Sequence, residues 1–333
     1  MKLTELEQLN AIVALSKRIA GWPSTLADHG YTLERLELKI KKPDPTRKGV
    51  TIEVTPDILF LADAKNQSFI VELKSGTHQG FAQLDKMVGV TPIELVRYGR
   101  IVLANAANVI NHKISVAEVI NDDFLSEYLA EFNRVKHQAC LVSISPTNIQ
   151  SHHGHLADEK LNRKLKSGIP LNDTYRPTRL IRVLPATSDK YAVVRVVVES
   201  FIEAWIDNER SLTTTQIAER VFKGYWGRID NWARDHFLKE SKAILKDMEQ
   251  TEFNRYLRPV PNSDEWKLLH LLESIEHKWR SRALQNFQAL ARSYKWRRRN
   301  NEPYKKRVIA QTSMEDIEGF LSVPNNEDGE QET

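Results

Sequence analysis

Three charged residues lie on two neighbouring apolar segments in the first quarter of the chain. Asp57 precedes Ile58-Leu59-Phe60-Leu61, and Glu72 and Lys74 end the segment Phe69-Ile70-Val71-Glu72-Leu73-Lys74. Glu72 and Lys74 are two residues apart, so they point to the same face of an extended strand. Mg²⁺ prefers carboxylate oxygens, and a nearby lysine can orient a water molecule or stabilise charge on a phosphate. The pattern therefore predicts a metal site suited to phosphate chemistry.

The arrangement of Pro56-Asp57 and Glu72-Leu73-Lys74, with the glutamate fifteen positions after the aspartate, resembles the PD-(D/E)xK nuclease superfamily. The resemblance covers roughly residues 1–110. It implies that Asp57 and Glu72 bind the metal, that the Leu73 carbonyl also reaches it, and that Lys74 activates a water molecule. Mg²⁺, with Mn²⁺ as a substitute, is the implied cofactor, and DNA is the implied partner. The alternative is a solvent-facing Glu/Lys pair on a hairpin.

The same resemblance implies a further acid on the first helix and a glutamine after the lysine. Residues 4–20 have an amphipathic pattern, and Thr4 and Glu7 have capping-box spacing. Because Glu7 has this capping role, we favour Glu5 as the additional metal ligand. Gln79 and Gln83 are one turn apart on a predicted helix, where one of them would contact DNA or the water. Two exposed surface glutamines are the alternative.

Hydrophobic patterning predicts the elements that position these residues. Strands are expected at 31–41, 51–61, 68–74, 101–104 and 139–144, and helices at 4–20, 79–89 and 115–136. The order helix, three strands, helix, strand is the core order of the nuclease fold. The predicted class is α/β, a restriction-endonuclease-like core with a mixed central sheet flanked by helices. A mainly α, winged-helix-like DNA-binding domain is expected to follow.

A polar, turn-rich segment at 151–177 predicts a linker between a nuclease-like domain at 1–150 and a second region at 178–310. This segment contains His153 and His155, whose spacing is also compatible with zinc ligands. No matching ligand cluster follows in the sequence, so a zinc hydrolase is the less favoured alternative.

The second region is predicted to bind nucleic acid. Thr213 and Gln216 have capping-box spacing, a long helix follows at about 230–248, and two short apolar segments flank the turn residues 261–264. This order resembles a winged helix-turn-helix, which implies that the basic helix enters the major groove. The expected DNA-contacting residues are His236, Lys239, Lys242 and Lys246, together with Arg297, Arg298 and Arg299 in a later basic segment. A helical protein-contact domain is the alternative.

Composition limits the remaining possibilities. The chain has 333 residues, a net charge of +4 and one cysteine, which excludes an internal disulfide. It contains no apolar run of the length that spans a membrane, so a cytoplasmic protein is expected. Residues 311–333 are acidic and predicted to be disordered.

The predicted function is a metal-dependent DNA endonuclease in restriction or anti-phage defence, or a transposon endonuclease subunit. The sequence leaves open a homodimer or a larger defence or transposition complex. A non-catalytic DNA-binding regulator or assembly subunit that uses a nuclease-like fold is the alternative.

Overall fold

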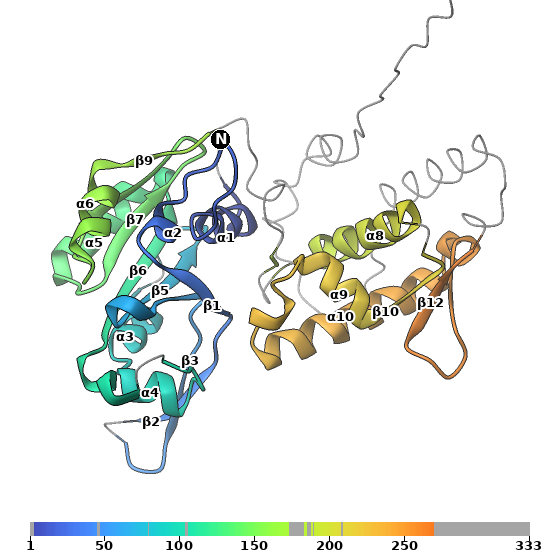
Figure 1. Cartoon of the computed structure of the whole chain (residues 1–333), viewed down its shortest axis with the longest axis horizontal. Helices are drawn as coiled ribbons and strands as arrows, with labels where there is room; N and C mark the ends of the chain where they lie inside the picture. Colours follow the sequence, from blue (N-terminus) through green and yellow to red (C-terminus); the bar gives the residue numbers. More distant parts are fainter. Residues whose placement is uncertain are drawn as a thin grey trace, which may run out of the picture.

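The computed structural model describes residues 3–44, 47–78, 80–103, 106–172, 183–184, 188, 190–207 and 209–269. Gln79, the three arginines at 297–299 and the acidic segment 311–333 lie outside these residues. Figure 1 shows a sheet-containing part, coloured blue to green, beside a mainly helical part in yellow and orange.

A mixed sheet of seven strands organises the first part of the described chain. Its spatial order is β1-β4-β5-β6-β7-β8-β9, in which β5, β6 and β7 are mutually parallel and every other neighbouring pair is antiparallel. The strands are β1 (Thr32–Leu36), β4 (Ile58–Ala62), β5 (Gln67–Lys74), β6 (Lys113–Asn121), β7 (Cys140–Ile144), β8 (Asn148–His153) and β9 (Ile169–Pro170). A separate antiparallel ribbon pairs β2 (Ile40–Pro43) with β3 (Thr51–Val54).

Helices cover both faces of the sheet, which confirms the predicted α/β class. They are α1 (Glu5–Ala14), α2 (Thr25–Asp28), α3 (Ala82–Val88), α4 (Pro92–Arg97), α5 (Leu125–Val135) and α6 (Glu159–Ser167). Phe69 and Val71 belong to the core cluster that contains α1, α2 and α6, whereas Ile70 packs with α3, α4 and α5. Because strand side chains alternate between faces, Glu72 and Lys74 lie on the same side of β5 as Ile70.

The second part contains three helices and a small antiparallel sheet in the order β10-β12-β11. Its elements are α8 (Lys190–Ile206), β10 (Ser211–Thr213), α9 (Thr214–Phe222), α10 (Asn231–Glu249), β11 (Leu257–Pro259) and β12 (Glu265–Leu268). The predicted capping box of Thr213 and Gln216 is present at the start of α9. Leu212, Phe222 and Phe237 are buried in a core cluster that continues into the α1 side of the large sheet.

Short 3₁₀ turns complete the described secondary structure: η1 (Asp63–Lys65), η2 (Ala106–Asn111), η3 (Asp122–Phe124), η4 (Trp226–Arg228) and η5 (Glu252–Arg255). No helix in the part of the chain that the structure describes is long and apolar enough to cross a membrane.

Two predicted strands are each divided in the structure. The segment 31–41 splits into β1 and β2 at Glu37, whose φ of 52° ends the extended conformation. The segment 51–61 splits into β3 and β4 around Pro56, which has no amide hydrogen to donate to a ladder. As a result, β3 leaves the main sheet to pair with β2, and Asp57 lies in the bend that enters β4.

The predictions for residues 101–136 were partly wrong. Residues 101–103 form no strand, and the expected helix at 115–136 begins instead with strand β6, followed by α5. Strand β6 lies between two parallel neighbours and is buried along most of its length. Such a strand carries apolar residues on both faces, so it lacks the alternation that identifies a half-exposed strand.

The expected linker at 151–177 was also wrong for its described first part. It contains the end of β8, the whole of α6 and strand β9, which extend the large sheet. Helix α6 buries little beyond Leu161, Asn162 and Leu165, so its composition is polar although its structure is regular. Asp158 caps its first turn by accepting a hydrogen bond from the Leu161 amide.

Candidate active site

The structure brings Asp57, Glu72 and Lys74 together at one end of the β4–β5 hairpin. The antiparallel register places Ile58 opposite Val71, so Asp57 lies beside the last residues of β5. Oδ2 of Asp57 accepts a hydrogen bond of 2.6 Å from the Leu73 amide. The Lys74 ammonium lies 2.6 Å from Oε1 of Glu72. The sequence-predicted carboxylates and lysine are therefore one local group.

A fourth charged residue, Glu118, joins this group although the sequence analysis missed it. Glu118 on β6 is the direct register partner of Glu72 on β5. Glu72 and Glu118 are 5% and 2% exposed, and Oε2 of each is buried without a hydrogen-bond partner among the described residues. Because buried polar atoms are nearly always paired, these two oxygens are available to a water molecule or a cation.

The pKa of Glu118 is raised to about 7, mainly by burial and in part by the charge of Glu72, although the Lys74 ammonium opposes the increase. Burial also raises the pKa of Glu72, against the opposing effect of the Lys74 ammonium. Burial alone would lower the pKa of Lys74, but the charges of Glu72, Asp57 and Glu118 outweigh it and raise the pKa. The shift for Lys74 thus favours its charged form, whereas the pKa values of the surrounding acids are shifted upward.

The pKa of Asp57 is raised well above its ordinary value. Burial is the main cause, and the negative charges of Glu72 and Glu37 add to it. The hydrogen bond from the Leu73 amide opposes the increase because it stabilises the carboxylate. The structure thus records the Leu73 amide beside Asp57, whereas the sequence analysis expected the Leu73 carbonyl to face a metal.

Glu5 lies at the edge of the same group. Two hydrogen bonds between Leu3 and the Asn121 side chain hold the chain just before α1 against the end of β6. Ser75 Oγ lies 3.5 Å from Glu5 Oε2, and the Glu5 charge contributes to the raised pKa of Asp57. The first helix therefore presents its acid toward the site, as the sequence analysis expected.

Gln83 supports the site without entering it. Its Nε2 donates a hydrogen bond of 3.3 Å to the carbonyl of Thr55, two residues before Asp57. No described hydrogen bond joins Gln83 to the acids, and its expected contact with DNA or the site's water stays a prediction. Gln79, the other predicted glutamine, lies outside the described residues.

The acidic group contains carboxylate oxygens, the ligand type that hard cations prefer. Among the charges that shift the pKa of Glu72 and Glu118, the Lys74 ammonium is the one positive charge. Within the described residues, no group of three or more His, Cys, Asp or Glu side chains is arranged to hold a metal ion. Mg²⁺ is commonly held by one or two carboxylates together with water and substrate phosphate. The unpaired Oε2 atoms of Glu72 and Glu118 supply oxygen ligands of that kind.

The histidine-rich segment forms structural contacts. His153 Nε2 lies 2.9 Å from the His137 carbonyl, and its Nδ1 lies 3.0 Å from Asn133 Oδ1. Because a carbonyl only accepts, His153 Nε2 carries the proton and has no lone pair for a metal. His155 Nδ1 pairs with Asn162. Among the described residues, no group of three or more metal-ligating side chains includes these two histidines.

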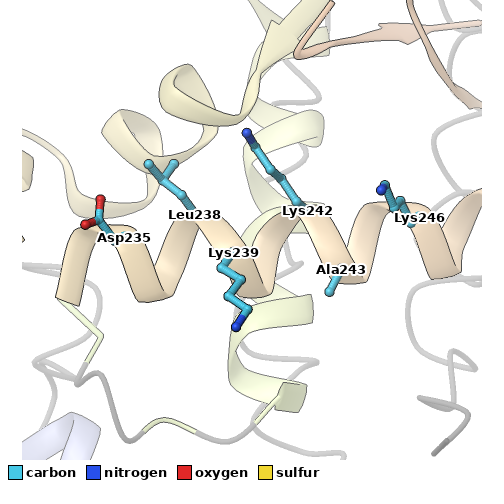
Figure 2. Close-up of a pocket in the computed structure, with 6 residues that line it drawn as sticks. All are labelled: Asp235, Leu238, Lys239, Lys242, Ala243 and Lys246. Carbon is cyan, nitrogen blue, oxygen red and sulfur yellow. The ribbon is translucent and has the colours of Figure 1, made fainter. Parts of the chain in front are cut away.

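A basic stripe occupies the exposed face of α10 (Figure 2). Lys239, Lys242 and Lys246 line an open pocket of about 460 Å³, together with Asp235, Leu238 and Ala243. In this view the Lys239 side chain points down and the Lys242 side chain points up, so the three lysines do not converge on one point. Lys242 pairs with Asp264 at 3.0 Å, whereas Lys239 and Lys246 have no ion pair within the described residues. His236 is exposed on the same helix but does not line this pocket.

Comparison with protein families matches residues 4–179, more than half of the chain, to the MJECL32 domain. Comparison with curated proteins and with solved structures gave no match. The matched range includes α1, the complete large sheet and all of the acidic residues described above. The chain therefore belongs to the MJECL32 domain family.

Proposed function

We propose that this chain is a divalent-cation-dependent DNA endonuclease whose reaction centre is formed by Asp57, Glu72, Glu118 and Lys74. The observation that carries the proposal is the pair of buried Oε2 atoms of Glu72 and Glu118, unpaired among the described residues, beside the partly exposed Lys74. Leaving two carboxylate oxygens without partners is costly, and a bound cation removes that cost. The resemblance of Pro56-Asp57 and Glu72-Leu73-Lys74 to the PD-(D/E)xK pattern gives the reaction class.

Each residue has a distinct role in this proposal. Mg²⁺, or Mn²⁺ in its place, would supply Lewis-acid stabilisation of a phosphate and lower the pKa of a bound water. Asp57 and Glu72 would hold the cation, with Glu118 and Glu5 as further carboxylates. The Leu73 amide fixes the orientation of Asp57. The Lys74 ammonium would orient the attacking water and offset the charge that develops on the phosphate.

The second part of the chain supplies the DNA-binding surface in this proposal. Its order of α8, β10, α9, α10, β11 and β12 is similar to a winged helix-turn-helix, with α10 as the recognition helix and the β11–β12 hairpin as the wing. The exposed side chains of Lys239 and Lys246 suit contacts with DNA phosphates. Restriction, anti-phage defence and a transposon endonuclease subunit are the settings proposed for this activity, in the cytoplasm.

A non-catalytic DNA-binding protein is the second candidate. The observation that favours it is the direct contact between Lys74 and Glu72, which occupies Oε1 of the proposed metal ligand. In such a protein, the lysine would permanently neutralise part of the acidic group.

The two candidates differ in DNA cleavage. The full chain is incubated with supercoiled plasmid and Mg²⁺ or Mn²⁺, beside Asp57→Asn and Lys74→Ala. Glu131→Gln, on the exposed surface of α5, is the matched control. We expect nicking by the wild type and the control, and a loss of at least about 100-fold in the two site variants. Nicking at equal rates by all four proteins overturns the nuclease proposal, and DNA binding without nicking supports the second candidate.

A further inference from the structure

The chain adopts an uncommon backbone conformation one residue after β1. Glu37 has a φ of 52°, in the left-handed region that a residue with a side chain seldom occupies. Its amide donates a hydrogen bond of 2.9 Å to the carbonyl of Asp57, and its side chain is buried. A conformation of this kind is strained and persists only where surrounding contacts enforce it. The Glu37 backbone therefore lies in direct contact with the backbone of a proposed metal ligand.

The contacts that hold this turn come from the start of α10, in the second part of the chain. The indole Nε1 of Trp232 donates a hydrogen bond of 2.7 Å to the Glu37 carbonyl. The Asp230 amide donates to the Leu36 carbonyl at 3.0 Å, and the Asp230 side chain accepts from the Lys39 amide at 3.4 Å. The turn is thus held on both sides of Glu37 by the first residues of α10.

Side-chain contacts reinforce this junction. The Lys39 ammonium lies 4.4 Å from the centre of the Trp232 ring, a cation–π arrangement. Arg228 pairs with Glu34 at 2.8 Å, and Ile229 forms a parallel bridge with Leu36. Asp230 is also the N-cap of α10, so the residue that binds the turn is part of the helix itself. Movement of α10 would therefore be transmitted to the Glu37 turn.

We propose that Trp232 is a positioning residue that couples the basic face of α10 to the acidic site through Glu37 and Asp57. Three consecutive hydrogen bonds carry the coupling: the Trp232 indole to Glu37, the Glu37 amide to the Asp57 carbonyl, and the Leu73 amide to Asp57 Oδ2. Lys239 and Lys246 lie further along the same continuous helix, whose first residues hold the Glu37 turn. An anion bound to these lysines would therefore act on the turn through α10. This inference rests on the proposed function because it assigns a regulator to the same site.

Coupling of this kind is reciprocal in binding free energy. Short duplex DNA on α10 and a divalent cation at the acids are expected to strengthen each other's binding. The Glu37 carboxylate also contributes, because its charge is among those that act on Asp57. A shifted turn would move that charge as well as the Asp57 backbone.

The test uses the full chain and the variant Trp232→Phe. Phenylalanine retains a ring beside Lys39 but lacks the N–H that binds the Glu37 carbonyl. Mn²⁺ affinity, measured from the free Mn²⁺ signal in electron paramagnetic resonance, is expected to fall about 3- to 10-fold, as the loss of one hydrogen bond predicts. Trp226→Phe is the control, because Trp226 packs on Phe222 and Phe237 within the second part and has no described hydrogen bond to the turn. A general loss of packing would lower the Mn²⁺ affinity of both Trp232→Phe and Trp226→Phe. A positioning role of Trp232 lowers the Mn²⁺ affinity of Trp232→Phe alone.

The possible outcomes separate this inference from the proposed function. Equal Mn²⁺ affinity in the wild type and Trp232→Phe overturns the positioning role and leaves the nuclease proposal intact. An absence of Mn²⁺ binding in the wild type overturns the nuclease proposal, and amide hydrogen exchange then decides the positioning role. Faster exchange of the Glu37 and Leu73 amides in Trp232→Phe than in Trp226→Phe supports it, and equal exchange overturns it.

Discussion

Glu72 and Glu118 are directly opposed on the parallel strands β5 and β6, with both side chains buried on the same face of the sheet. Like charges in directly opposed positions destabilise a sheet. The Lys74 ammonium neutralises the negative charge of Glu72 through its contact with Oε1. The second carboxyl avoids the remaining repulsion by favouring its protonated form, since burial raises the pKa of Glu118 to about 7.

Glu118→Gln is therefore expected to stabilise the protein at alkaline pH. The pKa of Glu118 is about 7 in the folded protein and 4.5 ordinarily, so the folded state binds its proton more tightly than the unfolded state does. Below pH 4.5, Glu118 is protonated in both states, so its burial does not reduce the free energy of unfolding through ionisation. Above this pH the free energy of unfolding falls progressively, until the pH exceeds the folded pKa of Glu118. The gain in unfolding free energy should reach on the order of 1–3 kcal/mol at pH 8 and disappear near pH 4. Urea unfolding at the two pH values measures it, and an equal gain at both would contradict the assignment.

Replacing Lys239 and Lys246 by glutamine should weaken DNA binding in a salt-dependent manner. Each phosphate contact releases counterions, so the slope of log K against log salt should fall by about 0.9 for each lysine that is lost. Fluorescence anisotropy with a labelled duplex at several salt concentrations gives the slope. The double variant Lys160→Gln and Lys164→Gln, at two exposed positions of α6, controls for the change in net charge. An unchanged slope in the double variant would remove α10 from the DNA-binding surface.

Asp158 should contribute to the free energy of unfolding at neutral pH, and this contribution should be lost in acid. It caps α6 and pairs with Lys65 at 2.5 Å and with His29 at 3.4 Å. Burial alone would raise the pKa of Asp158, but the Leu161 amide, Lys65 and His29 outweigh it and lower the pKa.

The lowered pKa fixes the sign of the pH effect. The stabilisation from the ionised Asp158 is complete above its ordinary pKa and is lost as the pH falls through the folded pKa. Asp158→Asn keeps the cap and loses the ion pairs, so its deficit should be largest at neutral pH and shrink in acid. Asp158→Ala should lose about 1 kcal/mol more, through the cap. Thermal unfolding between neutral and acidic pH measures both, and a deficit independent of pH would contradict the ion-pair role.

Cys140 should be chemically inert in the folded protein. The residue is 1% exposed on β7, and burial raises the pKa of its thiol to about 12. Because the thiolate is the reactive form, a disulfide reagent should react slowly in native buffer and completely in guanidinium. Rapid reaction in the native state would show that β7 opens readily.

Local sequence signals were sufficient for parts of this architecture. The β4–β5 hairpin was predictable because two segments rich in β-branched and aromatic residues flank a polar turn. The capping box that starts α9 and the length of α10 were predictable because caps and helical periodicity are local.

The remainder depends on contacts that no local pattern contains. Glu118 was missed because Val116, Ala117, Val119 and Ile120 match helical spacing as well as they match a strand buried on both faces. At Glu37, where the first predicted strand divides, the carbonyl accepts a hydrogen bond from Trp232, which lies in the other part of the chain. An acid pair across two strands becomes visible only when the pairing of the strands is known.

The parallel pairing of β5 and β6 also has a consequence for how the chain folds. Parallel neighbours need a long crossover, and here that connection includes α3, α4 and η2. The β4–β5 hairpin can form from adjacent residues and bring Asp57 to Glu72 early, whereas Glu118 arrives only when the crossover closes. Repulsion between the two glutamates is thus absent from the early folding steps and enters at closure. Alkaline pH should therefore slow the docking of β6 rather than the formation of the hairpin.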